Sequence, residues 1–159
     1  MSDPTGVRLP PSALTWALFS RERLPWALIG LTLGLVEGAT IAIFVKQAYS
    51  AVLPAWTVNF AVSLVTGASA LANIISFVWA NLAHGRARVS LLVALQAAFA
   101  CAVGLIAFAP AASGGLVLTI LAVIAARMLW AGVLTVRSAV WTANYPRHVL
   151  AQMTGRIVV

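Results

Sequence analysis

The sequence predicts an all-α integral membrane protein with four transmembrane helices. Of the 159 residues, 62% are hydrophobic and 8% are charged, and the mean hydropathy is +1.01. Soluble domains carry about 25% charged residues, so this chain has too few polar side chains to cover a surface in water. Two uncharged runs, residues 56–80 and 89–109, are each long enough to cross a bilayer core of about 30 Å.

The basic segment between these two runs sets the predicted orientation. Two spans joined by a short turn are antiparallel, and short loops rich in Lys and Arg stay in the cytoplasm. The arginines near the ends of the spans share one predicted side: Arg8, Arg21, Arg23, Arg86, Arg88, Arg137, Arg147 and Arg156. Lys46 falls on the other side. Both termini are therefore expected in the cytoplasm, which requires an even number of spans.

The first span is predicted at residues 25–45, after a cytoplasmic tail at residues 1–24. Gly30, Gly34 and Gly38 recur every four residues in this span, which places them on one face of a helix. Such a face lets another helix approach closely, because helix association in lipid depends on van der Waals contact. These three glycines are therefore predicted to serve helix packing.

Three more spans complete the predicted bundle. The uncharged runs at residues 56–80 and 89–109 are the second and third spans, and residues 116–136 form the fourth. Residues 137–159 follow as a cytoplasmic segment. Pro146 lies within this segment and interrupts any straight continuation of the fourth helix.

Two ionisable residues lie well inside the predicted spans, Glu37 in the first and Arg127 in the fourth. A charge at the centre of the bilayer costs about 2.5–3.5 kcal/mol, so each is a candidate functional residue. Both fall near the middle of their spans, and we expect them to pair and to line a polar cavity. Glu37 would then carry a proton, and Arg127 would bind an anion or tune the Glu37 carboxylate. The alternatives are a purely structural ion pair, or an Arg127 side chain that extends toward the membrane surface because the fourth span begins later than residue 116.

Two amides inside the spans are weaker candidates for the same pathway. Asn73 lies in the second span and Gln96 in the third. An amide in a transmembrane helix bonds to a neighbouring helix at least as often as it contacts a ligand. We therefore predict that Asn73 and Gln96 are substrate or ion contacts of lower rank than Glu37 and Arg127.

Several classes of function and ligand have no support in the residues. The sequence lacks a nucleophile elbow, a phosphate-binding loop and a metal-ligand cluster, so no enzymatic activity, cofactor or metal is expected. The net charge of +7 would suit nucleic acid, but the arginines lie at the ends of apolar runs and form no patch with interleaved aromatic residues. Anionic lipid headgroups are the expected partner of these charges, and no nucleic acid is expected.

The loop before the third span resembles a signature of a known family. Gly85, Arg86 and Arg88 match the second half of the glycine- and arginine-containing motif that major facilitator superfamily transporters carry between spans 2 and 3. The leading glycine and the acidic residue of that motif are absent from this sequence. The resemblance predicts that these three residues form a cytoplasmic loop motif.

The fourth span and the segment after it extend this resemblance. Arg127 followed by Gly132 is similar to an arginine–glycine pair that the family often has in span 4. The basic run at residues 145–156 is similar to the family's segment between spans 4 and 5. Together with the loop, these features make residues 25–159 similar to the N-terminal part of such a transporter.

The resemblance implies a secondary active transporter of small molecules, with protons as the expected coupling ion. Nine of the ten basic residues are arginines, which is typical of a GC-rich bacterial genome, so a bacterial cytoplasmic (inner) membrane is expected. The family has twelve spans in two six-helix bundles, each built from two inverted three-helix repeats. On that template the chain is an N-terminal fragment whose four helices belong to the first bundle, and residues 137–159 lead toward a missing fifth span. The remaining spans, membrane lipids and a small-molecule substrate are the expected partners.

Two other functions stay open. Four spans with a glutamate in the first also resemble the small multidrug resistance family, which implies a complete exporter that works as a dimer. The 24-residue tail, the segment after the fourth span and the intramembrane Arg127 argue against it. The other alternative is a non-transporting membrane subunit that docks a partner through the glycine face of the first span.

Overall fold

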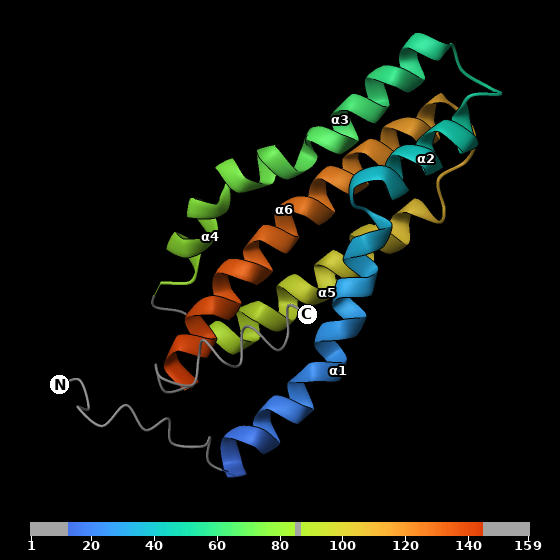
Figure 1. Cartoon of the computed structure of the whole chain (residues 1–159). Helices are drawn as coiled ribbons and strands as arrows, with labels where there is room; N and C mark the ends of the chain where they lie inside the picture. The colour runs from blue at the N-terminus through green and yellow to red at the C-terminus, as the bar shows by residue number, and fades with distance from the viewer. Residues whose placement is uncertain (1–12, 85–86, 145–159) are drawn as a thin grey trace, which may run out of the picture.

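The computed structural model describes residues 13–84 and 87–144, and it has the all-helical fold that the sequence predicts. No strand occurs within these ranges. Figure 1 shows the longest helix, α6, running the length of the bundle, with α3 and α4 along one side and α5 along another. The helices are α1 (Ala13–Leu35), α2 (Gly38–Tyr49), α3 (Ala55–Ile74), α4 (Ser76–Leu82), α5 (Arg88–Ile106) and α6 (Ser113–Asn144).

Three of these helices, α3, α5 and α6, are long and apolar enough to cross a membrane. A fourth span is present if Leu24–Leu35 and Gly38–Tyr49 are counted as one broken span, because the two segments pass the same test together. They meet at a bend of 46°. The chain is therefore a membrane-embedded helical protein with three to four candidate spans, and the predicted four corresponds to the count that includes the broken span.

The first span is not the single helix predicted at residues 25–45. α1 begins at Ala13, inside the predicted tail, and ends at Leu35. Glu37 is extended, with φ −115° and ψ 142°, and Gly38 has a φ of +52°. This left-handed backbone cannot continue a right-handed helix, and among the amino acids glycine adopts it without strain. The backbone at Gly38 therefore separates the two helices and lets α2 start in a different direction from α1.

The second predicted span, residues 56–80, is also divided. α3 and α4 meet at Ile75, which belongs to neither helix. Beside this point the Ser76 hydroxyl donates a hydrogen bond to the backbone carbonyl of Asn73 at 2.7 Å. Serine side chains that bond to the preceding turn bend helices, and this contact marks the place where the helix changes direction.

The third and fourth spans lie close to their predicted positions. α5 matches the range 89–109 to within three residues at either end. α6 contains the range 116–136 but continues to Asn144, so the start of the predicted cytoplasmic segment 137–159 is helical. No proline or glycine lies in that extension, so no residue there breaks the helix. Pro146 lies outside the described residues.

Three clusters of buried side chains follow α6 along its length and join it to its neighbours. The first cluster joins α2, α3 and α6, and within it Tyr49 Oη and Thr119 Oγ1 form a buried hydrogen bond of 2.9 Å. The other two clusters join α6 mainly to α5. Their buried members include Val65 and Val123 in the first cluster, Phe99 and Ala126 in the second, and Leu95 and Val133 in the third.

The glycine face predicted for the first span does not pack against another described helix. A Cβ atom added at Gly30, Gly34 or Gly38 would meet no neighbouring atom within 4 Å. The break before Gly38 also removes this residue from the common face. Close packing on a helical glycine occurs instead at Gly132 of α6, which faces the ring of Trp79. The predicted role of these three glycines in helix packing is therefore not tested by the described helices. It stays a prediction that another helix, outside the described residues, packs on this face.

Candidate functional site

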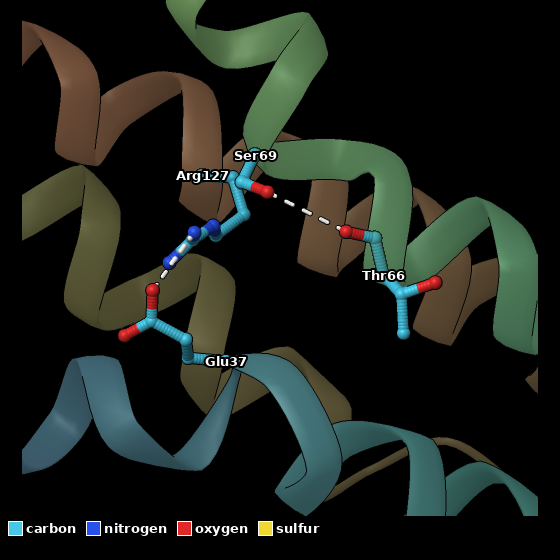
Figure 2. A network of polar contacts seen from close by, with 4 residues as sticks. All are labelled: Glu37, Thr66, Ser69 and Arg127. Atoms are coloured by element: carbon cyan, nitrogen blue, oxygen red, sulfur yellow. Dashed lines mark hydrogen bonds and ion pairs between the residues drawn. The ribbon is translucent and has the colours of Figure 1, made fainter.

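Glu37 lies at the break between α1 and α2, near the middle of the broken span. It is the residue immediately before α2, and its side chain makes no capping hydrogen bond to that helix. Figure 2 shows the carboxylate directed away from the ribbon of α2 and toward α6. The break therefore positions Glu37 between α1 and α2, with its carboxylate facing α6.

Arg127 reaches Glu37 from the middle of α6. It is the fifteenth of the 31 residues in the candidate span Ser113–Ala143. Arg127 Nη2 donates a hydrogen bond to Glu37 Oε1, and the two atoms are 3.0 Å apart (Figure 2). The pairing that we predicted from the depth of the two residues is confirmed. Its role in transport stays a prediction.

The two members of this ion pair differ in exposure. The Arg127 side chain is 11% exposed, whereas that of Glu37 is 51% exposed. Arg127 Nη1 is buried and has no hydrogen-bond partner among the described residues. A charge-assisted hydrogen bond to an opposite charge offsets part of the cost of burying a guanidinium group. Arg127 therefore depends on Glu37 more than Glu37 depends on Arg127.

A pocket of about 190 Å³ lies beside the pair. Both charged residues line it, together with Ser69 and Asn73 from α3 and Trp130 from α6. Three of the four predicted pathway residues thus share one cavity. It combines an anion, a cation, an amide, a hydroxyl group and an indole, which is a suitable lining for a small polar ligand.

Ser69 and Trp130 line this pocket and were both missed by our sequence analysis. The Ser69 hydroxyl group donates a hydrogen bond to the backbone carbonyl of Thr66 at 3.4 Å (Figure 2). Ser69 precedes Asn73 by four residues, so both lie on one face of α3. That spacing was the signal in the sequence that could have identified Ser69.

Gln96, the fourth predicted pathway residue, is not brought to this pocket. It follows Leu92 by four residues on α5 and lines a separate pocket between α1, α5 and α6. The sequence places Gln96 inside a span. The direction in which its side chain points depends on which side of α5 packs against α6, and the sequence does not show this. The structure therefore groups Gln96 with residues at another level of the bundle.

The predicted loop motif is described only in part. Gly85 and Arg86 lie outside the described residues. Arg88 is the first residue of α5, and with His84 and Ser138 it lines a third pocket, of about 270 Å³. The roles predicted for Gly85, Arg86 and Arg88 stay predictions.

The described part of the chain holds no group of three or more His, Cys, Asp or Glu side chains arranged to bind a metal ion. No protein-family model, curated protein or solved structure matches the chain. The pocket around Glu37 and Arg127 is therefore the feature of the described chain that points to a function.

Proposed function

We propose that this chain forms part of a secondary active transporter of small molecules, of the major facilitator type, in a bacterial cytoplasmic (inner) membrane. The observation that carries the proposal is the ion pair between Glu37 and Arg127 beside a pocket, near the middle of two candidate spans. Ionisable residues inside membrane spans are costly and mark substrate or proton pathways. Helices broken at mid-membrane depth form the binding sites of many transporters.

Glu37 is the proposed proton carrier. When its carboxylate is ionised, it accepts the hydrogen bond from Arg127, and the pair has no net charge. A proton on Glu37 removes the attraction between opposite charges and leaves a weaker hydrogen bond. Half of the Glu37 side chain is left uncovered by the described helices, so no described side chain has to move before a proton binds to it.

Arg127 is the proposed substrate contact, or the group that tunes Glu37. A negatively charged or strongly polar substrate group would compete with Glu37 for the same guanidinium group. Proton binding to Glu37 would therefore favour substrate binding to Arg127, and the coupling is reciprocal. Asn73 lines the same pocket and would bond to further polar groups of the substrate.

The test is transport by the complete gene product in sealed vesicles. Uptake of lactate, galactose and ethidium, which represent an anion, a sugar and an organic cation, is measured with and without an imposed pH gradient. We expect one of these classes to accumulate in response to the gradient. Glu37→Gln should abolish the response to the gradient, and Arg127→Gln should reduce uptake by at least about tenfold, the equivalent of one lost charge-assisted contact.

Lys46→Gln is the matched control, because Lys46 is an exposed cation on α2 that lies outside the pocket. It should leave both uptake and its response to the gradient unchanged. Gradient-driven uptake that survives Glu37→Gln would contradict the proposed role of Glu37. Failure of all three substrate classes to accumulate would count against the transporter itself.

One observation favours a second candidate function, that of a non-transporting membrane subunit. Gly30 and Gly34 lie on α1 with open space above them, so a helix of another protein could approach this face closely. In that case Gly34→Leu should break the association with the partner, whereas Glu37→Gln should leave it intact. If the protein is a transporter, Glu37→Gln should abolish gradient-driven uptake, whereas Gly34→Leu should leave uptake intact.

A further inference from the structure

The charge balance of the Glu37–Arg127 pair restricts which ligands its pocket can hold. One carboxylate faces one guanidinium group, with Glu37 Oε1 3.0 Å from Arg127 Nη2, so the two charges cancel. These two residues are the ionisable members of the pocket lining. The neighbouring helix α3 carries no ionisable side chain, and Lys46 and Tyr49 of α2 lie outside the lining. Among the described residues, a change of charge in the pocket therefore involves Glu37, Arg127 or the ligand.

A proton on Glu37 changes this balance by one charge. The pair then carries a net charge of +1, because a guanidinium group stays protonated. A charge near the middle of a span costs about 2.5–3.5 kcal/mol, so a ligand with one negative charge stabilises the protonated site. A neutral ligand would leave the charge of Arg127 in place, and a dianion would leave an excess negative charge. The site is therefore neutral when it holds one proton and one monoanion.

A carboxylate is the ligand group best suited to replace Glu37 on Arg127. The existing hydrogen bond, from Arg127 Nη2 to Glu37 Oε1, already joins a guanidinium group to a carboxylate. A ligand carboxylate accepts the same bond, so the exchange leaves Arg127 with an acceptor of the same kind. The Arg127 side chain is 11% exposed and needs such an acceptor, because an unpaired buried charge is strongly destabilising.

The rest of the lining limits the size of the ligand and surrounds part of it with apolar groups. The volume of about 190 Å³ is smaller than the roughly 300 Å³ at which pockets for drug-sized ligands begin. Ala72, Ala131, Trp130 and Leu134 contribute apolar surface, which suits a hydrocarbon group better than a bare inorganic ion. The Asn73 amide offers a donor and an acceptor to a hydroxyl or keto group. These features together fit a carboxylic acid with few carbon atoms.

We propose that this pocket binds a small monocarboxylate and that one proton on Glu37 accompanies the anion. The inference rests on the proposed transport function and names its substrate class. When a proton binds to Glu37, the ligand carboxylate takes over the hydrogen bond from Arg127 Nη2, and Asn73 bonds to a hydroxyl or keto group of the ligand. On release, the anion leaves Arg127, Glu37 gives up its proton and the ion pair forms again. Each cycle moves one proton and one anion in the same direction, so no net charge crosses the membrane.

The first test compares small solutes of different charge in vesicles that contain the complete gene product. L-lactate is the monoanion, lactamide is its neutral analogue, malonate is a dianion and nitrate is an inorganic monoanion. The outer solution is neutral and the inner solution alkaline, and uptake by protein-free vesicles is subtracted because undissociated acids cross bilayers. We expect lactate to accumulate at least about tenfold more than the other three solutes, the equivalent of one charge-assisted contact. Equal accumulation of any of these three would overturn the proposal.

The second measurement determines whether transport moves charge. An electrical potential is imposed with valinomycin and a potassium gradient while the pH gradient is held constant. The initial rate of lactate uptake should be unchanged by the potential, because one proton and one monoanion are electrically neutral together. A rate that follows the potential would contradict the proposed stoichiometry.

A variant of Asn73 tests where the ligand lies. Asn73→Leu should lower the preference for lactate over propionate by about three- to tenfold, because the amide loses its hydrogen bond to the 2-hydroxyl group. Asn59→Leu is the matched control, since it makes the same substitution at an exposed position of α3 outside the pocket. If both variants lower the preference equally, or neither does, the assignment of the ligand to this pocket is wrong.

The outcomes separate this inference from the proposed function. If galactose or ethidium accumulates in response to the pH gradient and lactate does not, the protein is a transporter, and the monocarboxylate proposal is overturned. If no solute of any class accumulates, the proposed transport function fails and this inference fails with it. Lactate uptake that depends on the pH gradient, ignores the electrical potential and excludes lactamide supports both.

Discussion

Gly132 of α6 lies directly beneath the indole ring of Trp79 of α4. A Cβ atom added at Gly132 would be 2.8 Å from Trp79 Cδ2, which is closer than real Cβ atoms come, and 3.0 Å from Cε2. The Trp79 ring packs against the third core cluster, which limits its movement. α4 can therefore approach α6 this closely only because residue 132 lacks a side chain.

Gly132→Ala should destabilise the protein by about 1–3 kcal/mol, the usual cost of overfilling a packed site. Thermal unfolding of the purified protein, followed by loss of the monodisperse peak in size-exclusion chromatography, provides the measurement. Gly104→Ala on α5 is the control, because a Cβ atom there meets nothing within 4 Å. An equal loss of stability in both variants would mean that the Trp79 contact is not the cause.

Gly38→Ala should also destabilise the protein, for a different reason. The φ of +52° at Gly38 costs a residue with a side chain about 1–2 kcal/mol. Gly34→Ala is the matched control, since Gly34 is helical and has open space around it. If Gly38→Ala instead raises the unfolding temperature, α1 and α2 form one continuous helix in the membrane, and the break is not a property of the native state.

The two halves of the Glu37–Arg127 pair should respond unequally to mutation. Glu37→Gln leaves a mostly buried guanidinium group without its partner and should cost about 1–3 kcal/mol. Arg127→Gln leaves a carboxylate that can be neutralised by a proton, whereas a guanidinium group stays charged, so its cost should be smaller. Unfolding temperatures of the two single variants and of the double variant measure the difference and the coupling. A larger cost for Arg127→Gln would contradict the dependence of Arg127 on Glu37.

The buried bond between Tyr49 and Thr119 gives a prediction about the first core cluster. Tyr49→Phe leaves the Thr119 hydroxyl group buried without its partner and should destabilise the protein by about 1–3 kcal/mol. Combining it with Thr119→Val removes both polar groups and should restore part of the lost stability. Additive losses in the double variant would show that the hydroxyl groups do not interact.

Much of the membrane architecture was predictable from residue order. The long apolar runs identified α3, α5 and most of α6, because crossing a bilayer requires a certain length of apolar helix. The depths of Glu37 and Arg127 followed from counting residues along their spans, and this was enough to predict their pairing. Asn73 was placed in the same region for the same reason.

The breaks between α1 and α2 and between α3 and α4, and the helix faces that share a pocket, were not predictable in this way. Neither Gly38 nor Ile75 is accompanied by a proline, and Gly38 is one of three regularly spaced glycines, so its spacing indicated a packing face and not the end of α1. Gln96 has the same kind of environment in the sequence as Asn73, yet it lies in a different pocket. The regular spacing of the three glycines predicted close packing on the first span, but the close contact with an aromatic ring occurs at Gly132.

The sequence by itself determined that this protein is helical and membrane-embedded, and that its two charges inside the spans lie at matching positions along their helices. These properties depend on hydropathy and on the constant rise of a helix, which act along the chain. The tertiary structure decided which side chains share a pocket, where the first two spans break and which glycine packs against a ring. Those features depend on how each helix is rotated against α6, and that rotation is set by contacts between residues far apart in the sequence.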